Sequence, residues 1–541
     1  MAILAPVQRQ RRSCLILILS IGILLVVLTA GVLTFSSLSP FNHPTKISTP
    51  VARSTPGTHA TPVGIGVVQE PNNEYIGLSD GNYAFDTSRS DGDLKRQGSA
   101  KFKSGDKVGA RSLWLQAIAQ DTSDAEALIY LEDLQVTTAS PNNYITLVVG
   151  TMLTGSDSSA IGAGRNALQG AYVAQKEYND GAKLSNGKQI LLLLANSGSQ
   201  TDYATTVAQQ IVQASKQDQS IVGVMGWPYS SRTLKAVDVL SKANIPMVSS
   251  TASADELTGK SPFFFRVAPS NKYQAIQGAQ YAKQQLHAHR VALFLDPHDA
   301  YSNSLGLDFS QQFSTNGDQI VDTEHYTVGQ PQQLPALLQT ALSNQPDLIY
   351  FSGYSSDVAT LLINLPSSAQ NLQVMGGDAL YELNGYSSSA RPAGFSRLSF
   401  TTFFYPDEWD ILGLSGHEPN FFAEYTANFD PHSQRPGTYG FSRPENDTVL
   451  AYDATTALLK GYQNALNAGT STVTPNALQQ GLAKITGGQA FQGVSGQISF
   501  GPDGDPINKA VVILYVDSVG HIKMIPNNGI QGCFQLGQTG C

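Results

Sequence analysis

The chain has 541 residues, of which 14% are charged, and a formal net charge of −9. This length predicts several domains, and the acidic balance, with no basic stripe beyond the N-terminus, argues against nucleic-acid binding. The sequence contains no Cys/His spacing typical of zinc, no Walker loop, no Gly-x-Ser-x-Gly elbow and no His-Glu-x-x-His. It therefore predicts no enzyme, no metal and no cofactor.

The first residues have the pattern of a membrane anchor. Arg9, Arg11 and Arg12 precede an apolar run over residues 15–35. At about 1.5 Å per residue, a helix over this run is about as long as a bilayer core is thick. The basic residues predict that residues 1–14 are cytoplasmic. The expected localisation is the cell membrane, single-pass, with the main domain extracytoplasmic.

Two small segments follow. Residues 36–88 are rich in Pro, Ser and Thr without an apolar period, which predicts an extended tether. Residues 89–138 predict a small helical hairpin. Its small residues and one tryptophan are spaced as in a single tetratricopeptide-like repeat: Gly98, Ala110, Trp114 and Ala117. Thr122 stands where that repeat usually carries Pro, and a generic helical hairpin is the alternative.

Strand-like and helix-like segments alternate over residues 144–541. Each apolar run of strand length is followed by Gly, Ser or Asp and then by a helical pattern, and two such series succeed one another. This pattern predicts an α/β fold of two doubly wound parallel-sheet lobes, joined by a hinge that the chain crosses more than once. The expected boundaries are about 144–267 and 405–505 for lobe 1, and about 272–400 and 506–525 for lobe 2.

Hydroxyl residues cluster after two neighbouring predicted strands of lobe 1. Ser230 and Ser231 follow the first strand, and Thr251 and Ser253 follow the second. Ligands of open parallel sheets bind beyond the carboxyl ends of the strands. Hydroxyls beside helix N-termini suit a small anion such as a carboxylate. The alternative is that these residues only cap helices.

The ordered series VVGTMLTG, GRNALQGAYVAQKEYND, GVMGWPYSS, IPMVSSTASADEL and SPFFFRVAPSN resembles the type I periplasmic binding proteins. Within that family it is similar to the leucine/isoleucine/valine-binding proteins of ABC transporters, over about residues 144–523. The resemblance implies a solute-binding protein that captures a small amino acid or related ligand for an ABC permease. One alternative is a membrane-tethered sensor with the same clamshell. Another is an amide hydrolase that uses Asp378 opposite Ser231.

The resemblance also assigns a ligand-binding site shared by the two lobes. From lobe 2, Asp378 would pair with an α-ammonium group, and Tyr301 and Tyr354 would close over the ligand. A solvated loop carboxylate is the alternative for Asp378. The hydroxyl and backbone groups expected around the ligand carboxylate come from lobe 1: Ser230, Ser231, Thr251, Ala252 and Ser253.

The sequence departs from the family near the expected side-chain pocket. Residues 196–198 are Asn-Ser-Gly where an acidic pair is common, and residues 227–229, Trp-Pro-Tyr, crowd the adjoining loop. These departures leave the ligand's side chain open.

The cysteines permit one disulfide bond. Cys533 and Cys541 close a short C-terminal loop, while Cys14 lies at the edge of the apolar run. A bond between Cys533 and Cys541 is predicted if the chain lies outside the cytoplasm, and two reduced thiols are the alternative.

Overall fold

The computed structural model describes residues 64–315, 317–369, 371–386, 394–526 and 530–538. All of them belong to the second of the chain's two compact units, Ala60–Cys541. The predicted cytoplasmic N-terminus, the predicted membrane span and most of the predicted tether lie outside the described residues.

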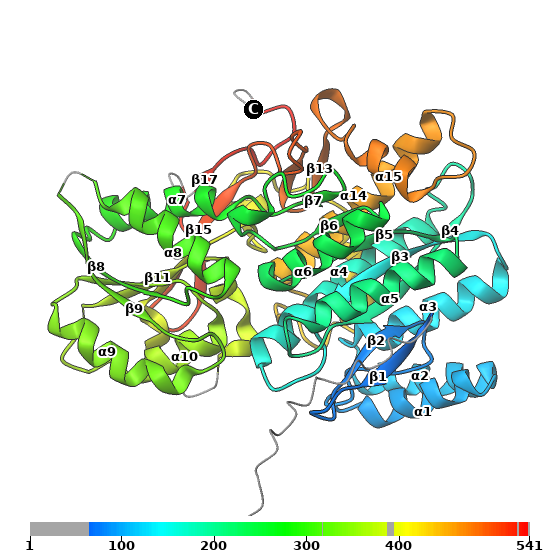
Figure 1. The fold of residues 1–541 in the computed structure, drawn as a ribbon, viewed down its shortest axis with the longest axis horizontal. Coiled ribbons are helices and arrows are strands. Elements are labelled where there is room, and N and C mark those ends of the chain that lie inside the picture. The colour runs from blue at the N-terminus through cyan, green and yellow to red at the C-terminus, as the bar shows by residue number, and fades with distance from the viewer. Residues whose placement is uncertain (1–63, 316, 370, 387–393, 527–529, 539–541) are drawn as a thin grey trace, which may run out of the picture. The chain divides into compact units, whose positions relative to one another are not determined.

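Lobe 1, in the described part of the chain, is built on a seven-stranded sheet of order β1-β2-β4-β3-β5-β6-β7 (Figure 1). Strands β3 to β7 pair in parallel, and β1 and β2 add an antiparallel edge. The parallel strands are apolar along their length because helices cover the sheet. The strands are β1 (Gly66–Gln69), β2 (Tyr75–Ser79), β3 (Tyr144–Thr151), β4 (Gln189–Asn196), β5 (Ile221–Met225), β6 (Met247–Ser249) and β7 (Phe264–Arg266).

The helices of lobe 1 come from two stretches of the chain. Helix α14, far along the sequence, packs against α4, which connects β3 to β4. The helices are α4 (Ser158–Asp180), α5 (Tyr203–Gln217), α6 (Ser230–Leu240), α14 (Asn446–Asn467) and α15 (Pro475–Leu482), with short 3-10 turns η1 (Ser241–Ala243), η2 (Asp255–Leu257) and η7 (Gly487–Gln489). A small hairpin, β13 (Phe491–Gly493) with β14 (Gly496–Ile498), follows them.

Lobe 2, within the described residues, has an eight-stranded sheet of order β16-β15-β12-β11-β10-β8-β9, with β17 paired to β15. Strands β8 to β12 are parallel, and β15 joins them antiparallel. The strands are β8 (Arg290–Leu295), β9 (Gln319–His325), β10 (Leu348–Phe351), β11 (Gln373–Gly376), β12 (Leu398–Thr402), β15 (Val511–Val516), β16 (Ile522–Met524) and β17 (Ile530–Gln531).

Helices of lobe 2 follow the same strand–helix alternation. They are α7 (Asn271–Gln284), α8 (Ala300–Phe313), α9 (Leu334–Ser343) and α10 (Ser355–Ile363), with 3-10 turns η3 (Pro331–Gln333), η4 (Asp378–Tyr381), η5 (Leu383–Gly385) and η6 (Phe395–Arg397). Helices α12 (Glu408–Ile411) and α13 (Phe421–Phe429) lie on the return to lobe 1. Within the described residues the chain passes between the lobes after β7, after β12 and before β15. The α/β fold with two parallel-dominated sheets is confirmed.

The predicted tether, residues 36–88, includes residues that form strands in the structure. Residues 66–79 form β1 and β2, and Gly77 of β2 pairs with Asn196 of β4. Ile76 and Leu78 are fully buried in the core between the sheet and α5. The Pro/Ser/Thr-rich composition ends before this segment, and the short apolar pattern of Tyr75–Ser79 is enough to extend an existing sheet.

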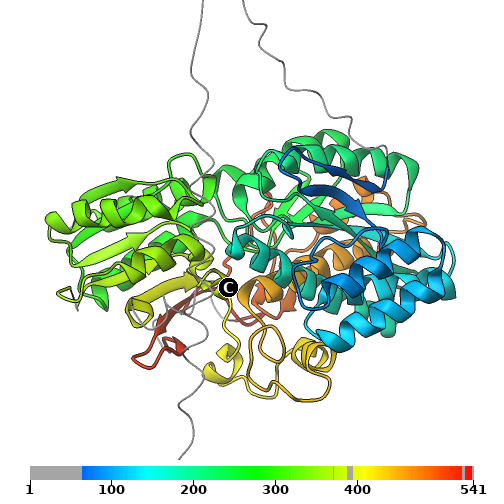
Figure 2. The same cartoon turned by 90° about the horizontal axis from the view of Figure 1, so that it is seen from below.

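Residues 92–139 form three helices instead of the predicted two-helix hairpin. They are α1 (Gly92–Lys103), α2 (Lys107–Gln120) and α3 (Ala125–Ala139). Trp114 is fully buried between them, and a Cβ at Gly98 would come within 2.5 Å of its indole nitrogen. Helix α3 packs on β4 and α4, and Figure 2 shows α1 and α2 on the same side of the molecule as lobe 1. Because a single hairpin cannot bury its own faces, this segment is part of lobe 1.

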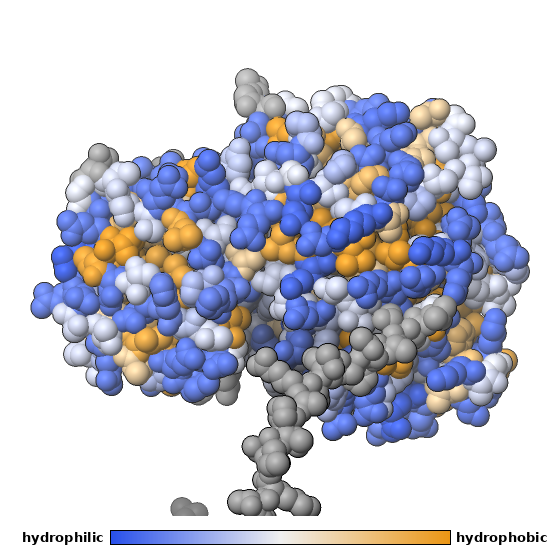
Figure 3. Space-filling model, viewed as in Figure 1, coloured by the Kyte–Doolittle hydropathy of each residue, from blue (hydrophilic) through white to orange (hydrophobic). Residues whose placement is uncertain are grey.

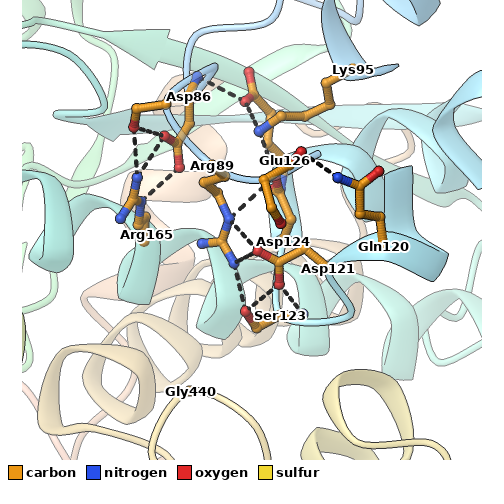
Figure 4. Close-up of polar contacts among 12 residues, drawn as sticks. Asp86, Arg89, Lys95, Gln120, Asp121, Ser123, Asp124, Glu126, Arg165 and Gly440 are labelled. Atoms are coloured by element: carbon orange, nitrogen blue, oxygen red, sulfur yellow. Dashed lines mark hydrogen bonds and ion pairs between the residues drawn. The ribbon is translucent and has the colours of Figure 1, made fainter. Parts of the chain in front are cut away.

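Ion pairs hold the segment before residue 144 together, and one of them attaches it to α4 (Figure 4). Lys95, with no exposed surface, pairs with Asp124 and lies 2.9 Å from Glu126. Arg165 of α4 binds Asp86 through two hydrogen bonds of 2.7 and 2.8 Å. We call the whole set the extension cluster: Asp86, Arg89, Lys95, Asp121, Asp124, Glu126 and Arg165.

No helix among the described residues is long and apolar enough to cross a membrane. This finding contradicts the predicted single-pass membrane localisation. The expected span, residues 15–35, lies outside the described residues.

Only one cysteine of the predicted disulfide bond, Cys533, lies among the described residues. Cys533 is disulfide-bonded, whereas Cys541 and Cys14 lie outside the described residues. The pairing of Cys533 with Cys541 therefore stays a prediction.

On the face drawn in Figure 3, hydrophobic residues form several patches separated by hydrophilic ones. Large exposed hydrophobics, such as Val108, Leu307 and Val519, lie on separate elements. Scattered residues of this kind are normal on a globular surface and do not by themselves mark a binding site.

Candidate ligand-binding site

The two lobes touch across their cleft. Ser231, at the start of α6, donates a hydrogen bond of 2.7 Å to Asp299 Oδ2, which caps α8 of lobe 2. Tyr229 of lobe 1 stacks on Tyr354 of lobe 2, with ring centroids 4.4 Å apart. These contacts join loops at the carboxyl ends of the strands, where ligands of such sheets bind.

A small cavity remains between these loops. The centre of a water molecule can occupy about 20 Å³ of it, which is little more than one water requires. A ligand the size of an amino acid therefore enters only if the lobes separate, as in hinge closure. The lining residues are Ala163, Pro228, Tyr229, Ser230, Thr251, Tyr301, Tyr354, Asp378, Ala379, Glu382 and Asp447.

The lobe 1 wall presents hydrogen-bond donors. Ser230 Oγ accepts bonds of 3.1 Å from the backbone N–H groups of Ser253 and Ala254, which leaves its own hydroxyl hydrogen to donate. Ser230 is the first residue of α6. The side chain of the preceding residue, Tyr229, makes no capping hydrogen bond to that helix. The N–H groups of the first turn carry partial positive charge. This wall suits a carboxylate.

The lobe 2 wall presents Asp378, at the start of η4 directly after β11. Its Oδ1 accepts hydrogen bonds from Gln274 Nε2 (2.8 Å) and the Tyr301 hydroxyl (3.0 Å). No described side chain donates to its Oδ2, although Asp378 is only 6% exposed. Burial raises the pKa of Asp378 to about 6, despite those two hydrogen bonds. Asp378 is therefore an acceptor that suits a cation.

Two further carboxyl groups line the cavity. Glu382 Oε2 accepts a hydrogen bond of 2.9 Å from Asn166 Nδ2 of α4, across the cleft. Asp447 lies in the first turn of α14. Burial, together with neighbouring carboxylates, raises the pKa of Glu382 well above its usual range and that of Asp447 to about 8. Among the described residues, no lysine, arginine or histidine lines this cavity.

A wider cavity, of about 700 Å³, lies elsewhere, between Tyr405, Tyr439, Arg443 and Lys523. Its guanidinium, Arg443, is already bound to Asp407 through bonds of 2.6 and 2.9 Å. No residue of α6 or of the loops that follow β5 and β6 lines this cavity. It is therefore a weaker candidate for the ligand-binding site.

The cavity brings together part of the predicted site. Ser231 does not line it, because its hydroxyl is engaged with Asp299. Ala252 and Ser253 lie behind Ser230, and the Ser253 hydroxyl is buried without a hydrogen-bond partner. The alternative of a solvated loop carboxylate for Asp378 is wrong, since that side chain is buried. The predicted residues that do line the cavity are Ser230, Thr251, Tyr301, Tyr354 and Asp378.

Sequence reasoning missed Glu382 and Asp447. Glu382 follows Asp378 by four residues in GGDALYEL, so its nearness to the site was readable. Asp447 gave no such signal, because it comes from the helix that returns to lobe 1 after the chain has completed most of lobe 2.

Comparisons with known proteins agree with this architecture. A family model described as "Periplasmic binding protein" matches residues 145–520, more than half of the chain. The "Leu/Ile/Val-binding protein BraC3" of Rhizobium johnstonii is 26% identical over 232 residues, 43% of this chain and 61% of that protein. The "Leu/Ile/Val-binding protein homolog 3" of Brucella melitensis is 26% identical over 218 residues, covering 40% and 57%. The chain thus spans about 60% of the length of these curated relatives.

Solved structures share the fold. A leucine-binding protein from Thermotoga maritima has a TM-score of 0.59 and 21% identity, over 72% of this chain and 99% of that one. A branched-chain amino acid transporter substrate-binding protein from Streptococcus pneumoniae, in complex with isoleucine, has a TM-score of 0.58 and 21% identity, over 71% and 100%. Residues 64–144 precede the family match.

Proposed function

The chain belongs to the periplasmic binding protein family, and on that premise we propose that it captures a small amino acid or related ligand between its lobes and delivers it to an ABC transporter. The relatives and structures named above are binding proteins rather than enzymes. No catalytic step is part of the proposal.

The observation that carries this proposal is that one cavity combines anion-binding donors near Ser230 with the buried acid Asp378. Lobe 1 contributes the Ser230 hydroxyl and the uncapped start of α6, which are donors for a carboxylate. Lobe 2 contributes the buried Asp378 carboxylate, an acceptor for an ammonium group. An α-amino acid carries both groups and therefore bridges the lobes, so its binding energy favours the closed state.

Delivery to a transporter is preferred to sensing. The sensor alternative depended on a membrane anchor and a separate helical repeat. The residues of the expected anchor lie outside the described residues and lend the sensor no support, and the residues of the repeat form part of lobe 1. A permease of an ABC transporter is accordingly the proposed partner.

Calorimetric titration of the full chain tests the proposal. At least one zwitterionic α-amino acid should bind. Its analogues without the amine or without the carboxylate should bind about thirtyfold or more weakly, because each leaves a buried group unpaired. Binding of sugars or purines but of no zwitterion would overturn the proposal.

A further inference from the structure

The cavity holds more acidic groups than one α-ammonium can neutralise. Asp378, Glu382 and Asp447 line the same small space, and no basic side chain of the described residues joins them there. An α-amino acid with an apolar side chain is neutral overall. Such a ligand would leave at least one buried or half-buried carboxyl group without a cation.

The protein itself gives these carboxyl groups only neutral partners. Asp378 receives hydrogen bonds from an amide and a phenol, and Glu382 and Asp447 receive theirs from asparagine amides or backbone. The donors are Gln274, Tyr301, Asn166, Asn384 and Asn446. A buried carboxylate without a countercharge is costly, so such a group holds its proton or takes a cation from outside.

The three acids come from different parts of the fold and meet only at the cavity. Asp378 and Glu382 follow β11 in lobe 2, whereas Asp447 projects from the start of α14 in lobe 1. Asp378 and Asp447 line the same cavity, and burial, followed by the charge of Asp378, raises the pKa of Asp447. A cation between them therefore contacts both lobes.

Aromatic rings add an independent feature that favours a cation. Tyr229 and Tyr354 stack at 4.4 Å, the Tyr301 ring lies 5.4 Å from Tyr354, and all three line the cavity. The face of an aromatic ring attracts ammonium and guanidinium groups. The Tyr229 ring already has the Arg232 guanidinium 5.5 Å from its centroid. The rings of Tyr301 and Tyr354 therefore remain to combine with the carboxylates around a ligand cation.

We propose that the ligand is a basic α-amino acid, whose α-ammonium pairs with Asp378 and whose side-chain cation is held by Glu382 and Asp447. This inference rests on the proposed function, since it assumes an α-amino acid in the cleft. Ser230 and the start of α6 hold the carboxylate, so the ligand carries one negative and two positive groups to a site of matching charge.

Matched ligands test the side-chain cation. L-lysine and L-norleucine differ by the terminal ammonium, and L-arginine and L-citrulline differ by the guanidinium charge. Each ligand is titrated into the full chain at about pH 7.5, where both ligand cations are charged. Lysine should bind at least about tenfold more tightly than norleucine, and arginine at least about tenfold more tightly than citrulline.

Variants locate the effect. Asp447→Asn removes a carboxylate that makes no hydrogen bond between the lobes. Glu382→Gln removes the other carboxylate but keeps an oxygen that accepts the hydrogen bond from Asn166. Either should reduce the charged-to-neutral preference about tenfold while norleucine affinity stays within about twofold. Asp93→Asn is the control, because Asp93 is 83% exposed and lies on α1, none of whose residues lines the cavity. It should change neither ligand's affinity.

The outcomes separate the two proposals. If leucine or norleucine binds as tightly as lysine and arginine, the proposed function stands and the basic side chain is wrong. If no α-amino acid binds, the proposed function itself fails. If basic amino acids bind preferentially but both variants keep the preference, the assignment of Glu382 and Asp447 is overturned. Thermal unfolding of each variant verifies that it is folded.

Discussion

Two acidic clusters in this molecule differ in what balances them. In the extension cluster, every carboxylate has a lysine or arginine as partner; Arg165, for example, binds Asp86 with both nitrogens of its fork. Around the cavity, Asp378, Glu382 and Asp447 face only neutral donors. Both clusters are largely buried, so the difference lies in the countercharge.

The contrast separates a structural role from a binding role. Charges that are paired inside the protein fix one part of the chain to another, here the segment before residue 144 to α4. Charges without an internal partner raise the cost of the ligand-free state and are compensated when a cationic ligand arrives. Removing a residue from the first cluster should therefore affect stability, and removing one from the second should affect binding.

Lys95→Met gives the largest expected effect. It leaves Asp124 and Glu126 buried without their cation and should lower the free energy of unfolding by about 3–5 kcal/mol. Urea denaturation followed by circular dichroism measures this. Arg96→Met, on the same helix, is the control. Its pair with Asp93 is exposed, so the loss should stay below about 1 kcal/mol. Equal losses for the two variants would contradict the structural role.

Asp378→Asn should weaken ligand binding without lowering the stability of the protein. Affinity for the best amino acid should fall by about 2–5 kcal/mol, because the ligand's ammonium loses its buried partner. Stability of the ligand-free protein at neutral pH should be unchanged or higher, since a buried carboxylate without a countercharge is removed. Calorimetry and thermal unfolding measure the two quantities. A large loss of stability with intact affinity would assign Asp378 to the framework.

The pH dependence should differ in sign between the clusters. Burial raises the pKa of Asp378 to about 6, so its contribution to ligand-free stability is fully present at low pH and is lost as pH rises through 6. For Asp121, burial acts to raise the pKa but the charge of Arg89 lowers it below its usual value. Its contribution is therefore present above the unfolded pKa and is lost as pH falls.

Affinity for L-norleucine, which carries no side-chain cation for Glu382 and Asp447, should follow the ionisation of Asp378. It should decline about tenfold per pH unit below pH 6, where the Asp378 carboxylate is protonated. Calorimetry between pH 5 and 8 measures the slope (about one decade per unit), and Asp378→Asn should flatten it. A steep slope that persists in this variant would point to another group.

Ser231→Ala should give the smallest effect. It removes two hydrogen bonds between the lobes, one donated to Asp299 and one accepted from the Ala300 N–H, each of which contributes about 0.5–1.5 kcal/mol. Because both bonds form in the closed state, affinity should fall about five- to a hundredfold. Ser314→Ala, at an exposed position after α8, is the control. A loss of about a thousandfold or more would instead mean that Ser231 contacts the ligand directly.

The fold was largely predictable from the sequence. The parallel strands are apolar over their whole length and are each followed by a turn and a helix, as in β5 and β10, so both lobes were recognisable. The edge strands β1 and β2 were missed. These strands have only four or five residues; β2 pairs with β4, and β1 pairs with β2. The pairing with the distant β4 leaves little local signal in the sequence.

The site was predictable where strand ends determine it. Ser230, Thr251 and Asp378 lie in or at the end of the loops that follow β5, β6 and β11, and they line the cavity. Ser231 was misplaced, because one residue along a helix start rotates the side chain by about 100° and turns it toward Asp299. Asp447 depends on how α14 docks against α4, which no local pattern encodes.

A crystal structure of the full chain grown with L-lysine tests the central claim most directly. The account predicts lysine between the lobes, with its carboxylate at Ser230 and the start of α6, its α-ammonium at Asp378, and its side-chain ammonium between Glu382 and Asp447. Lysine bound outside this cavity, or bound there with its side chain directed away from Glu382 and Asp447, would contradict it.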